Sequence, residues 1–135
     1  MGFSILIVDD EVDVAELFRQ RFRRETRRGV YVLHYTASGG EALDRLAAEI
    51  EPTLLAVLSD INMPGMDGLA LLGEIRQRFP DLPVMIVTAY SDDERRRQAA
   101  QYGAADFFTK PVDFEHLKAQ LGQLPSAPET RRPIE

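Results

Sequence analysis

Two patterns of apolar residues alternate along this chain: short continuous runs, and longer segments in which apolar residues recur at helical spacing. The runs are rich in β-branched and aromatic residues and are bounded by turn residues, which is typical of buried strands. They cover residues 5–8, 30–35, 54–58, 84–88 and 104–109. Each run is followed by a segment whose apolar residues lie three or four positions apart with charged residues between them, which predicts an amphipathic helix. Strand and helix are therefore expected to alternate five times.

Local signals place the ends of the expected helices. The first helix is expected to end near Gly29. Residues 38–41 and 91–94 each have the form Ser-x-x-Glu, a capping box that starts a helix, and the helix after the first box is expected to reach Ile50. The helix after the second box has few apolar side chains to bury against the sheet, so we expect it to be the least firmly anchored of the helices. Asp113 is a candidate cap for the last helix.

This alternation predicts an α/β fold with a doubly wound, five-stranded parallel sheet. Parallel neighbours need crossover connections, and right-handed helical crossovers place helices on both faces of the sheet. The 135 residues, 44% of them hydrophobic, suit one domain with a single core. We expect this domain to span residues 1–124. Residues 125–135, which contain three prolines among polar residues, are expected to form a tail or the stub of a linker.

Composition narrows the classes of function. The formal net charge of −6 disfavours direct nucleic-acid binding, because phosphates bind proteins mainly through Lys and Arg. No apolar run is long enough to span a bilayer and no signal peptide is apparent, so we expect no membrane attachment. The absence of cysteine excludes a disulfide framework and a thiolate site, and it fits a cytoplasmic protein. A cluster of six arginines within residues 19–28 is the local exception to the acidic balance.

Residues that can bind phosphate or a metal ion follow three of the expected strands. Asp9 and Asp10 follow the first strand, Asp60 follows the third, and Lys110 follows the fifth. The carboxyl ends of parallel strands share one edge of the sheet, so these side chains are expected to share a pocket. Two carboxylates about 4 Å apart repel by roughly 4 kcal/mol at an effective dielectric of about 20. Protonation of one carboxyl could relieve this repulsion, but a hard divalent cation with oxygen ligands, such as Mg²⁺, fits better.

Four motifs occur together in an order and spacing that resemble the receiver domain of two-component response regulators. They are Val-Asp-Asp-Glu at residues 8–11, Ser-Asp-Ile-Asn-Met-Pro-Gly-Met-Asp-Gly at residues 59–68, Thr88-Ala89 and Lys110-Pro111. The resemblance covers residues 3 to about 122. It implies a flavodoxin-like fold with strand order 2-1-3-4-5. It also implies a phosphorylation-dependent signalling switch, which is not an enzyme acting on small substrates but catalyses its own phosphotransfer and autodephosphorylation.

The resemblance assigns a role to each residue of the expected pocket. Asp60 would accept a phosphoryl group from a phosphohistidine on a sensor histidine kinase or a histidine phosphotransfer protein. Asp10 and Asp60 would bind Mg²⁺ through their carboxylates and Asn62 through its backbone carbonyl, with Asp9 acting through bound water. Lys110 would neutralise charge on the transferred group, and its peptide bond to the following proline is commonly cis in this family.

The resemblance also implies how the signal is formed and how long it lasts. The Thr88 hydroxyl would move to the phosphate while the ring of Phe107 turns inward, changing the surface presented to an effector domain or effector protein. Many members of the family have tyrosine where this chain has Phe107, and Phe108 competes for the same role. Asn62 and Tyr90 occupy positions that tune how fast water removes the phosphate.

Two other functions use part of the same residue set. A phosphohydrolase of the haloacid dehalogenase type also combines an Asp nucleophile with Mg²⁺, Thr and Lys. Enzymes of that type, however, have an Asp-x-Asp pattern at the first strand and a cap domain, and this chain does not match either feature. A scaffold that keeps the fold and takes no phosphate is disfavoured by the complete set of acids and lysine. The arginines of residues 19–28 are most simply a solvated surface. Because the first helix of receivers commonly docks the phosphodonor, we hypothesise that Arg19 and Arg23 bias partner choice by charge.

Overall fold

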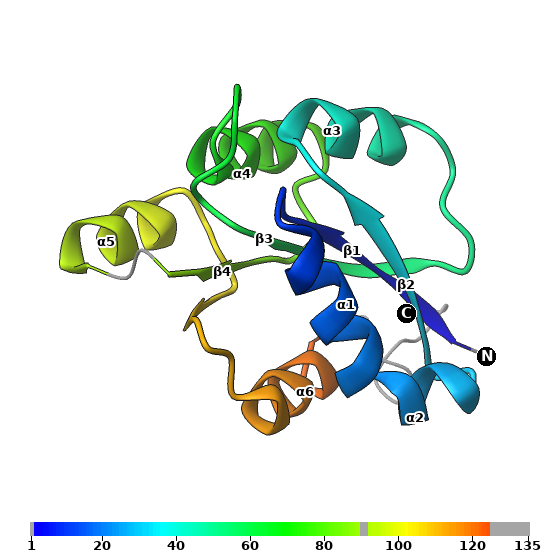
Figure 1. Ribbon diagram of the computed structural model, residues 1–135. Coiled ribbons are helices and arrows are strands. Elements are labelled where there is room, and N and C mark those ends of the chain that lie inside the picture. Colours follow the sequence, from blue (N-terminus) through cyan, green and yellow to red (C-terminus); the bar gives the residue numbers. More distant parts are fainter. Residues whose placement is uncertain (1, 90–91, 125–135) are drawn as a thin grey trace.

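The computed structural model describes residues 2–89 and 92–124 and contains a five-stranded parallel sheet (Figure 1). The elements are β1 (Phe3–Val8), α1 (Val12–Arg21), α2 (Arg23–Arg27), β2 (Tyr31–Thr36), α3 (Gly39–Ala47), β3 (Leu54–Ser59), α4 (Gly68–Arg78), β4 (Val84–Thr88), α5 (Asp93–Gln101), β5 (Asp106–Thr109) and α6 (Phe114–Gly122). The strand order is β2-β1-β3-β4-β5 and every neighbouring pair is parallel. The predicted α/β fold and its strand order are confirmed.

Helices cover both faces of the sheet. α1 and α6 lie on one face with the short α2 beside them, and α3, α4 and α5 lie on the other (Figure 1). Successive residues of a strand point to opposite faces. In β1, Ile5 and Ile7 join the cluster that contains Phe18 of α1, whereas Leu6 joins the cluster that contains Leu71 of α4. Burial on both faces explains why the strands are continuous apolar runs and do not alternate with polar residues.

The first helix does not run unbroken to Gly29 as expected. It divides into α1 and α2 at Phe22, whose backbone has φ −103° and ψ 13°. The ring of Phe22 is fully buried and contacts the rings of Phe18, Tyr31 and Phe114. The break therefore coincides with the residue that this aromatic cluster draws into the core. Gly29, with φ 76°, supplies the left-handed turn that leads into β2.

The start of α3 is as predicted, but its end is not. The side chain of Ser38 accepts a hydrogen bond from the backbone N–H of Glu41, and the Glu41 carboxylate in turn accepts one from the backbone N–H of Ala37. Ile50 lies outside the helix, because the backbone becomes extended at Ala48. The chain then turns toward Pro52, which cannot continue a helix.

Elements near the carboxyl end also differ in detail from the prediction. α5 is capped by the carboxylate of Asp92, and the predicted cap Ser91 lies outside the described residues. Ala99 is the one buried residue of α5, but α5 is not the least anchored helix as predicted, because the short α2 buries none of its residues. β5 begins at Asp106, two residues later than predicted, because residue 104 still hydrogen-bonds to the end of α5. Asp113 caps α6 as expected.

Two further features concern the whole described part of the chain. The Glu51–Pro52 and Lys110–Pro111 peptide bonds are cis, and the second of these was expected from the family resemblance. Among residues 2–89 and 92–124, no helix has both the length and the apolar character that a membrane span requires. The expected tail, residues 125–135, lies outside the described residues, and its assignment stays a prediction.

Candidate functional site

The predicted site residues gather at the carboxyl edge of the sheet. Asp9 and Asp10 follow β1, Asp60 follows β3, and Lys110 follows β5. One carboxylate oxygen from each of the three aspartates lies within 4.8 Å of the others. Side chains that are up to 101 positions apart in the sequence thus meet because parallel strands end at the same edge.

Asp60 is held firmly at this edge. Only 6% of its surface is exposed, its backbone N–H donates to the carbonyl of Val8, and its Oδ1 accepts a 2.7 Å hydrogen bond from the backbone N–H of Ile61. A Cβ placed on Gly68 would lie 1.9 Å from the carbonyl oxygen of Asp60. The close approach of the loop after β3 to the start of α4 therefore requires glycine at position 68.

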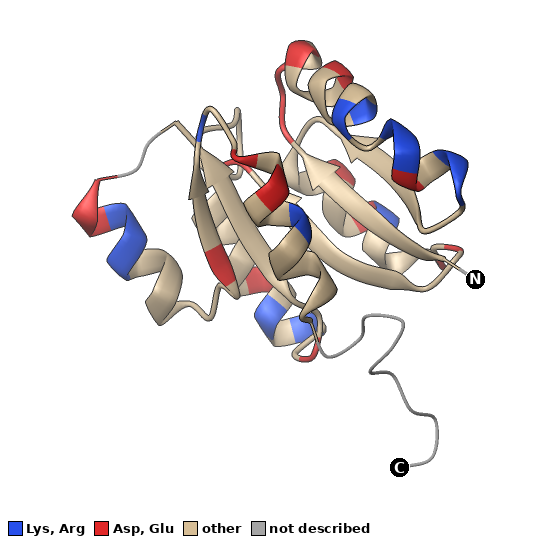
Figure 2. Ribbon diagram, turned by 90° about the horizontal axis from the view of Figure 1, so that it is seen from below, with Lys and Arg blue, Asp and Glu red and all other residues tan. Residues whose placement is uncertain are grey.

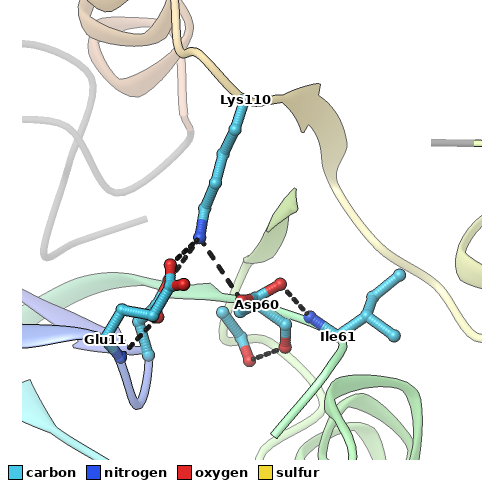
Figure 3. A network of polar contacts seen from close by, with 6 residues as sticks. Glu11, Asp60, Ile61 and Lys110 are labelled. Atoms are coloured by element: carbon cyan, nitrogen blue, oxygen red, sulfur yellow. Dashed lines mark hydrogen bonds and ion pairs between the residues drawn. The ribbon is translucent and has the colours of Figure 1, made fainter. Parts of the chain in front are cut away.

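Lys110 joins the acids across the pocket. Its Nζ lies 2.8 Å from Oδ2 of Asp9, 3.3 Å from Oδ2 of Asp60 and 3.5 Å from Oε1 of Glu11. Figure 3 shows the lysine reaching from the end of β5 to Glu11 and Asp60. The Asp9 carboxylate also accepts a hydrogen bond from the backbone N–H of Glu11. One ammonium group thus faces carboxylates that follow two different strands.

Burial and charge act in opposite directions on the groups of this pocket. Burial raises the pKa of Asp9, and the hydrogen bonds and charge that Lys110 and the backbone of Glu11 provide only partly offset that rise. Burial by itself would lower the pKa of Lys110, but its hydrogen bond to Asp9 and the charges of Asp9 and Asp60 outweigh this effect and raise it. Lys110 is therefore cationic at neutral pH.

The pocket carries more negative charge than its lysine can balance. The pocket holds four carboxylates, those of Asp9, Asp10, Glu11 and Asp60, and one ammonium group, that of Lys110. The three aspartates offer hard oxygen donors, and Asp10 is exposed, so an ion can reach the group from solvent. This donor set fits Mg²⁺, which binds carboxylates and retains several waters.

Thr88 and Phe107 lie on the same face of the sheet. In the pairing of β4 with β5, Ile86 lies beside Phe107 and Thr88 lies beside Thr109, and paired residues of parallel strands point to one face. Thr88 is fully buried, and its backbone carbonyl accepts from the N–H of Lys110. Phe107 packs with Ile86 toward α5, whereas Phe108 points to the opposite face and contacts the ring of His116. Of the two phenylalanines, Phe107 therefore shares a face with Thr88.

Two further residues, Asn62 and Tyr90, are predicted to set the lifetime of the phosphate. Asn62 is exposed and lines a surface hollow of about 310 Å³ between the loop after β3 and α5, together with Asp67 and Arg95. Tyr90 lies outside the described residues. The roles of Asn62 and Tyr90 in phosphate lifetime stay predictions.

Two contacts at the site were not expected from the sequence. Glu11 reaches Lys110, whereas the sequence marks Glu11 only as part of the Val-Asp-Asp-Glu motif. The guanidinium of Arg96 in α5 lies 4.6 Å from the centre of the Phe107 ring and donates to Oγ1 of Thr109 at 3.2 Å. No sequence pattern could have selected Arg96 from its two arginine neighbours, because its role depends on the rotation of α5 over β5.

Comparison with known proteins identifies the family that shares this arrangement. The family model described as the response regulator receiver domain matches residues 5–122. The response regulator protein FleR of Pseudomonas aeruginosa is 37% identical over 134 residues, which is 96% of this chain and 27% of FleR. The DNA-binding transcriptional regulator NtrC of Klebsiella pneumoniae is 51% identical over 82 residues, which is 61% of this chain and 17% of NtrC. The chain thus spans about a quarter or less of these two relatives.

Solved structures give the same result for the fold. The signal receiver domain of an HD domain-containing protein from Pseudomonas fluorescens has a TM-score of 0.81 at 26% identity, covering 92% of this chain and 94% of that domain. The response regulator TrrA of Thermotoga maritima, solved in complex with Mg²⁺-BeF, has a TM-score of 0.75 at 30% identity, covering 90% and 98% of the two chains.

Proposed function

This chain belongs to the family of response regulator receiver domains, and from that premise we propose that it is a switch operated by phosphorylation of Asp60. The phosphodonor is a phosphohistidine on a sensor histidine kinase or a histidine phosphotransfer protein. The observation that carries this proposal is the position of the Asp60 carboxylate, buried at the sheet edge, 3.3 Å from the ammonium of Lys110 and grouped with Asp9 and Asp10.

The proposed step is an in-line displacement at phosphorus. A carboxylate oxygen of Asp60 attacks the phosphoryl group, so that a P–O bond forms while the P–N bond to the donor histidine breaks. The imidazole leaves with the bonding electron pair and takes up a proton. The raised pKa of Lys110 keeps its ammonium charged beside Asp60, where it can stabilise negative charge on the transferred oxygens. The backbone N–H of Ile61 holds the other side of the carboxylate.

Asp9, Asp10 and Asp60 are the proposed holders of Mg²⁺, with Asn62 contributing its backbone carbonyl and Asp9 acting through water. When bound, the ion would supply charge neutralisation for both the acids and the transferred group. The crowding of three carboxylate oxygens within 4.8 Å supports this assignment, as does the Mg²⁺-BeF complex of the Thermotoga relative.

The output step follows from the added negative charge. We assign Thr88 as the hydroxyl that moves to the phosphate, after which Phe107 turns into the space that Thr88 leaves. Their position on one face of β4 and β5 supports this pairing, and Phe108, which faces α6, does not share it. A hydrogen bond to a charged group contributes about 1.5–3 kcal/mol, enough to shift a two-state equilibrium at least tenfold. The ring of Phe107 has no hydroxyl, so the signal depends on where the ring is buried.

The wider setting of the switch is also a proposal. Because the curated relatives are much longer than this chain, the changed surface around α5 and β5 is assigned to contact with an effector domain or a separate effector protein. Residues 1–124 form the receiver, and residues 125–135 form a tail or linker. Asn62 and Tyr90 set the lifetime of the phosphate. The cytoplasm is the expected location, where histidine kinases present their phosphorylated histidine.

Incubation with Mg²⁺ and acetyl phosphate tests the central claim by intact mass. The parent is expected to gain one phosphoryl group, and Asp60→Asn is expected to gain none. Asp81→Asn is the matched control, because it makes the same chemical change at an exposed carboxylate ahead of β4, at the opposite edge of the sheet. Phosphorylation of Asp60→Asn to the same extent as the parent would refute the proposal.

The rival phosphohydrolase predicts a different time course. A switch takes up about one phosphoryl group per chain and loses it slowly, whereas a hydrolase of the haloacid dehalogenase type turns over small phosphate esters continuously. Release of phosphate from a chromogenic ester would be followed with parent and Asp60→Asn. Sustained turnover that depends on Asp60 would favour the hydrolase.

A further inference from the structure

A surface on α2 and the residue after it carries four arginines that form no ion pair with a described acid. Arg23, Arg24, Arg27 and Arg28, here called the α2 arginine face, are all exposed. Within residues 2–89 and 92–124, no carboxylate lies within ion-pair distance of any of the four. Each of the other described lysines and arginines has a side-chain contact. They are Arg19, Arg21, Arg45, Arg76, Arg78, Arg95, Arg96, Arg97, Lys110 and Lys118.

This difference sets α2 apart from the other helices. α1, α4 and α5 each pair at least one arginine with an acid three or four positions away, as in Arg19 with Glu16 and Arg78 with Glu74. Such pairs neutralise a solvated helix surface. α2 has one acid, Glu25, and that acid is turned away to pair with Lys118 of α6 at 3.1 Å. No described carboxylate therefore pairs with the α2 arginine face, and its positive charge is available to bind a partner.

The backbone that carries these arginines is fixed in place. Phe22, directly before α2, is fully buried among aromatic rings. Lys118 donates both to Glu25 and to the backbone carbonyl of Arg21, which ties α2 to α6. The backbone N–H of Val30 donates to the carbonyl of Glu25 at the other end. A rigid support lowers the entropy lost when a charged surface binds a partner.

The α2 arginine face lies away from the acid pocket. α1 begins beside Asp10 and runs back along the sheet, so α2 lies near the amino edge, where Gly29 approaches Gly2. Figure 2 shows acidic residues at the start of α1 and basic residues over its end and α2. The four arginines line a surface hollow of about 580 Å³ together with Arg21, Lys118 and two acids, Glu25 and Glu115, so basic residues outnumber acidic ones there. The hypothesis that Arg19 and Arg23 bias the choice of phosphodonor stays a prediction, and Arg19 is paired with Glu16.

We propose that the α2 arginine face docks an acidic segment of a partner protein, one that presents carboxylates at helical i and i+4 spacing. Arginine forks bind planar carboxylates in a bidentate manner, and the face contains no lysine. Arg23 and Arg27, and likewise Arg24 and Arg28, are four positions apart, which places two guanidinium groups about one helical turn from each other. An acidic helix repeats its charges at the same interval.

Charge also favours a protein segment over a nucleic acid. The whole chain has a net charge of −6, so a long polyanion would meet repulsion beyond the face itself. A short acidic segment meets only the local field, because charges farther than about 10 Å are screened at 0.1 M salt. Docking at this face does not depend on phosphate at Asp60, since the two sites lie at opposite edges of the sheet.

The test uses a synthetic helical peptide with four glutamates at i and i+4 spacing, and a second peptide in which glutamine replaces each glutamate. Binding to the full chain is measured by fluorescence anisotropy. Arg24→Gln/Arg28→Gln is expected to weaken binding of the glutamate peptide about tenfold. Arg78→Gln/Arg97→Gln, which removes the same charge from α4 and α5, is expected to bind like the parent. Asp60→Asn is also expected to bind like the parent, which separates this test from that of the phosphorylation site.

Three results would overturn the proposal. One is equal binding of the glutamate peptide to the parent and to Arg24→Gln/Arg28→Gln, with both folded by circular dichroism. The second is an equal loss in Arg78→Gln/Arg97→Gln, which would mean that only net charge matters. The third is tighter binding of duplex DNA than of the peptide, lost in the same α2 variant, which would assign the face to nucleic acid.

Discussion

Replacing Arg96 with alanine is expected to ease the movement of Phe107 that the proposed switch requires. The Arg96 guanidinium lies 4.6 Å from the centre of the Phe107 ring and donates to Thr109 at 3.2 Å. The first contact holds the ring in its present position under α5, and the second holds the guanidinium over the ring. If the ring turns inward beside Thr88, it leaves the guanidinium behind. Arg96 therefore stabilises the resting state more than the phosphorylated state.

The size of this effect follows from the contact with the ring. A cation over an aromatic ring at an exposed site contributes about 0.5–1 kcal/mol. The hydrogen bond to Thr109 does not involve the ring, so it does not differ between the two ring positions. The upper value, about 1 kcal/mol, corresponds to about a fivefold change in the equilibrium between the two positions of Phe107.

The assay is titration of the ligand-free protein with beryllofluoride in the presence of Mg²⁺, a phosphate analogue that selects the switched state. Arg96→Ala is expected to bind it about fivefold more tightly than the parent. Arg97→Ala is the matched control, because it removes a neighbouring arginine of α5 that pairs with Glu94. Unchanged or weaker binding by Arg96→Ala, or an equal gain in Arg97→Ala, would refute the reasoning. Failure of the parent to bind would instead count against the proposed phosphorylation site.

Two further predictions concern packing and pH. Gly68→Ala is expected to destabilise the fold by about 2–4 kcal/mol, because the added Cβ would lie 1.9 Å from the carbonyl oxygen of Asp60. Gly73→Ala, at a position of α4 with open space around it, is the control and should be neutral or stabilising. Both free energies of unfolding would be measured in urea. Burial, with the charge of Arg45, lowers the pKa of His34, which accepts from Arg45 and contacts Ser4. The unfolded chain then binds the proton more readily, so His34 favours folding above about pH 6.5 and this contribution is lost as the pH falls through the lowered pKa. His34→Gln, which retains one acceptor and one donor group and cannot titrate, is expected to show a flatter decline of stability between about pH 7 and 5. Identical pH profiles would contradict this account.

The carboxyl-edge residues could be predicted because each follows a strand that is itself clear in the sequence. Asp9, Asp60 and Lys110 come directly after apolar runs, and parallel connection brings those strand ends together whatever the details of the helices. The strand order came from the family resemblance, because periodicity alone does not say which strands are neighbours. Once the order is given, the contact between Lys110 and Asp60 across β4 follows.

The parts that could not be predicted depend on tertiary contacts or on side-chain rotation. The division of the first helix at Phe22 reflects an aromatic cluster drawn from α1, β2 and α6, which helical periodicity does not register. The contact of Arg96 with Phe107 depends on how α5 lies over β5. The isolation of Arg24 and Arg28 is also invisible in the sequence, because Glu25 lies close by in the chain but turns toward Lys118.

The crowding of acids at the site leads to a last prediction, that Asp10→Asn stabilises the protein when no metal is present. One oxygen of Asp10 lies within 4.8 Å of an oxygen of Asp9 and of Asp60, and Lys110 contacts the latter two acids but not Asp10. Removing its charge relieves repulsion that screening at this exposed residue limits to about 1 kcal/mol.

Unfolding by urea would be measured in EDTA and again in excess Mg²⁺, with Asp81→Asn as the control for loss of a carboxylate elsewhere. In EDTA, Asp10→Asn is expected to be more stable than the parent. In Mg²⁺ the order should reverse, because an ion that binds only the folded state stabilises it, and the parent holds that ion with one more carboxylate. The same side chain would then cost stability without metal and add it with metal. If Asp10→Asn is the less stable protein in EDTA, or if Mg²⁺ stabilises both equally, the three acids do not form a common cation site.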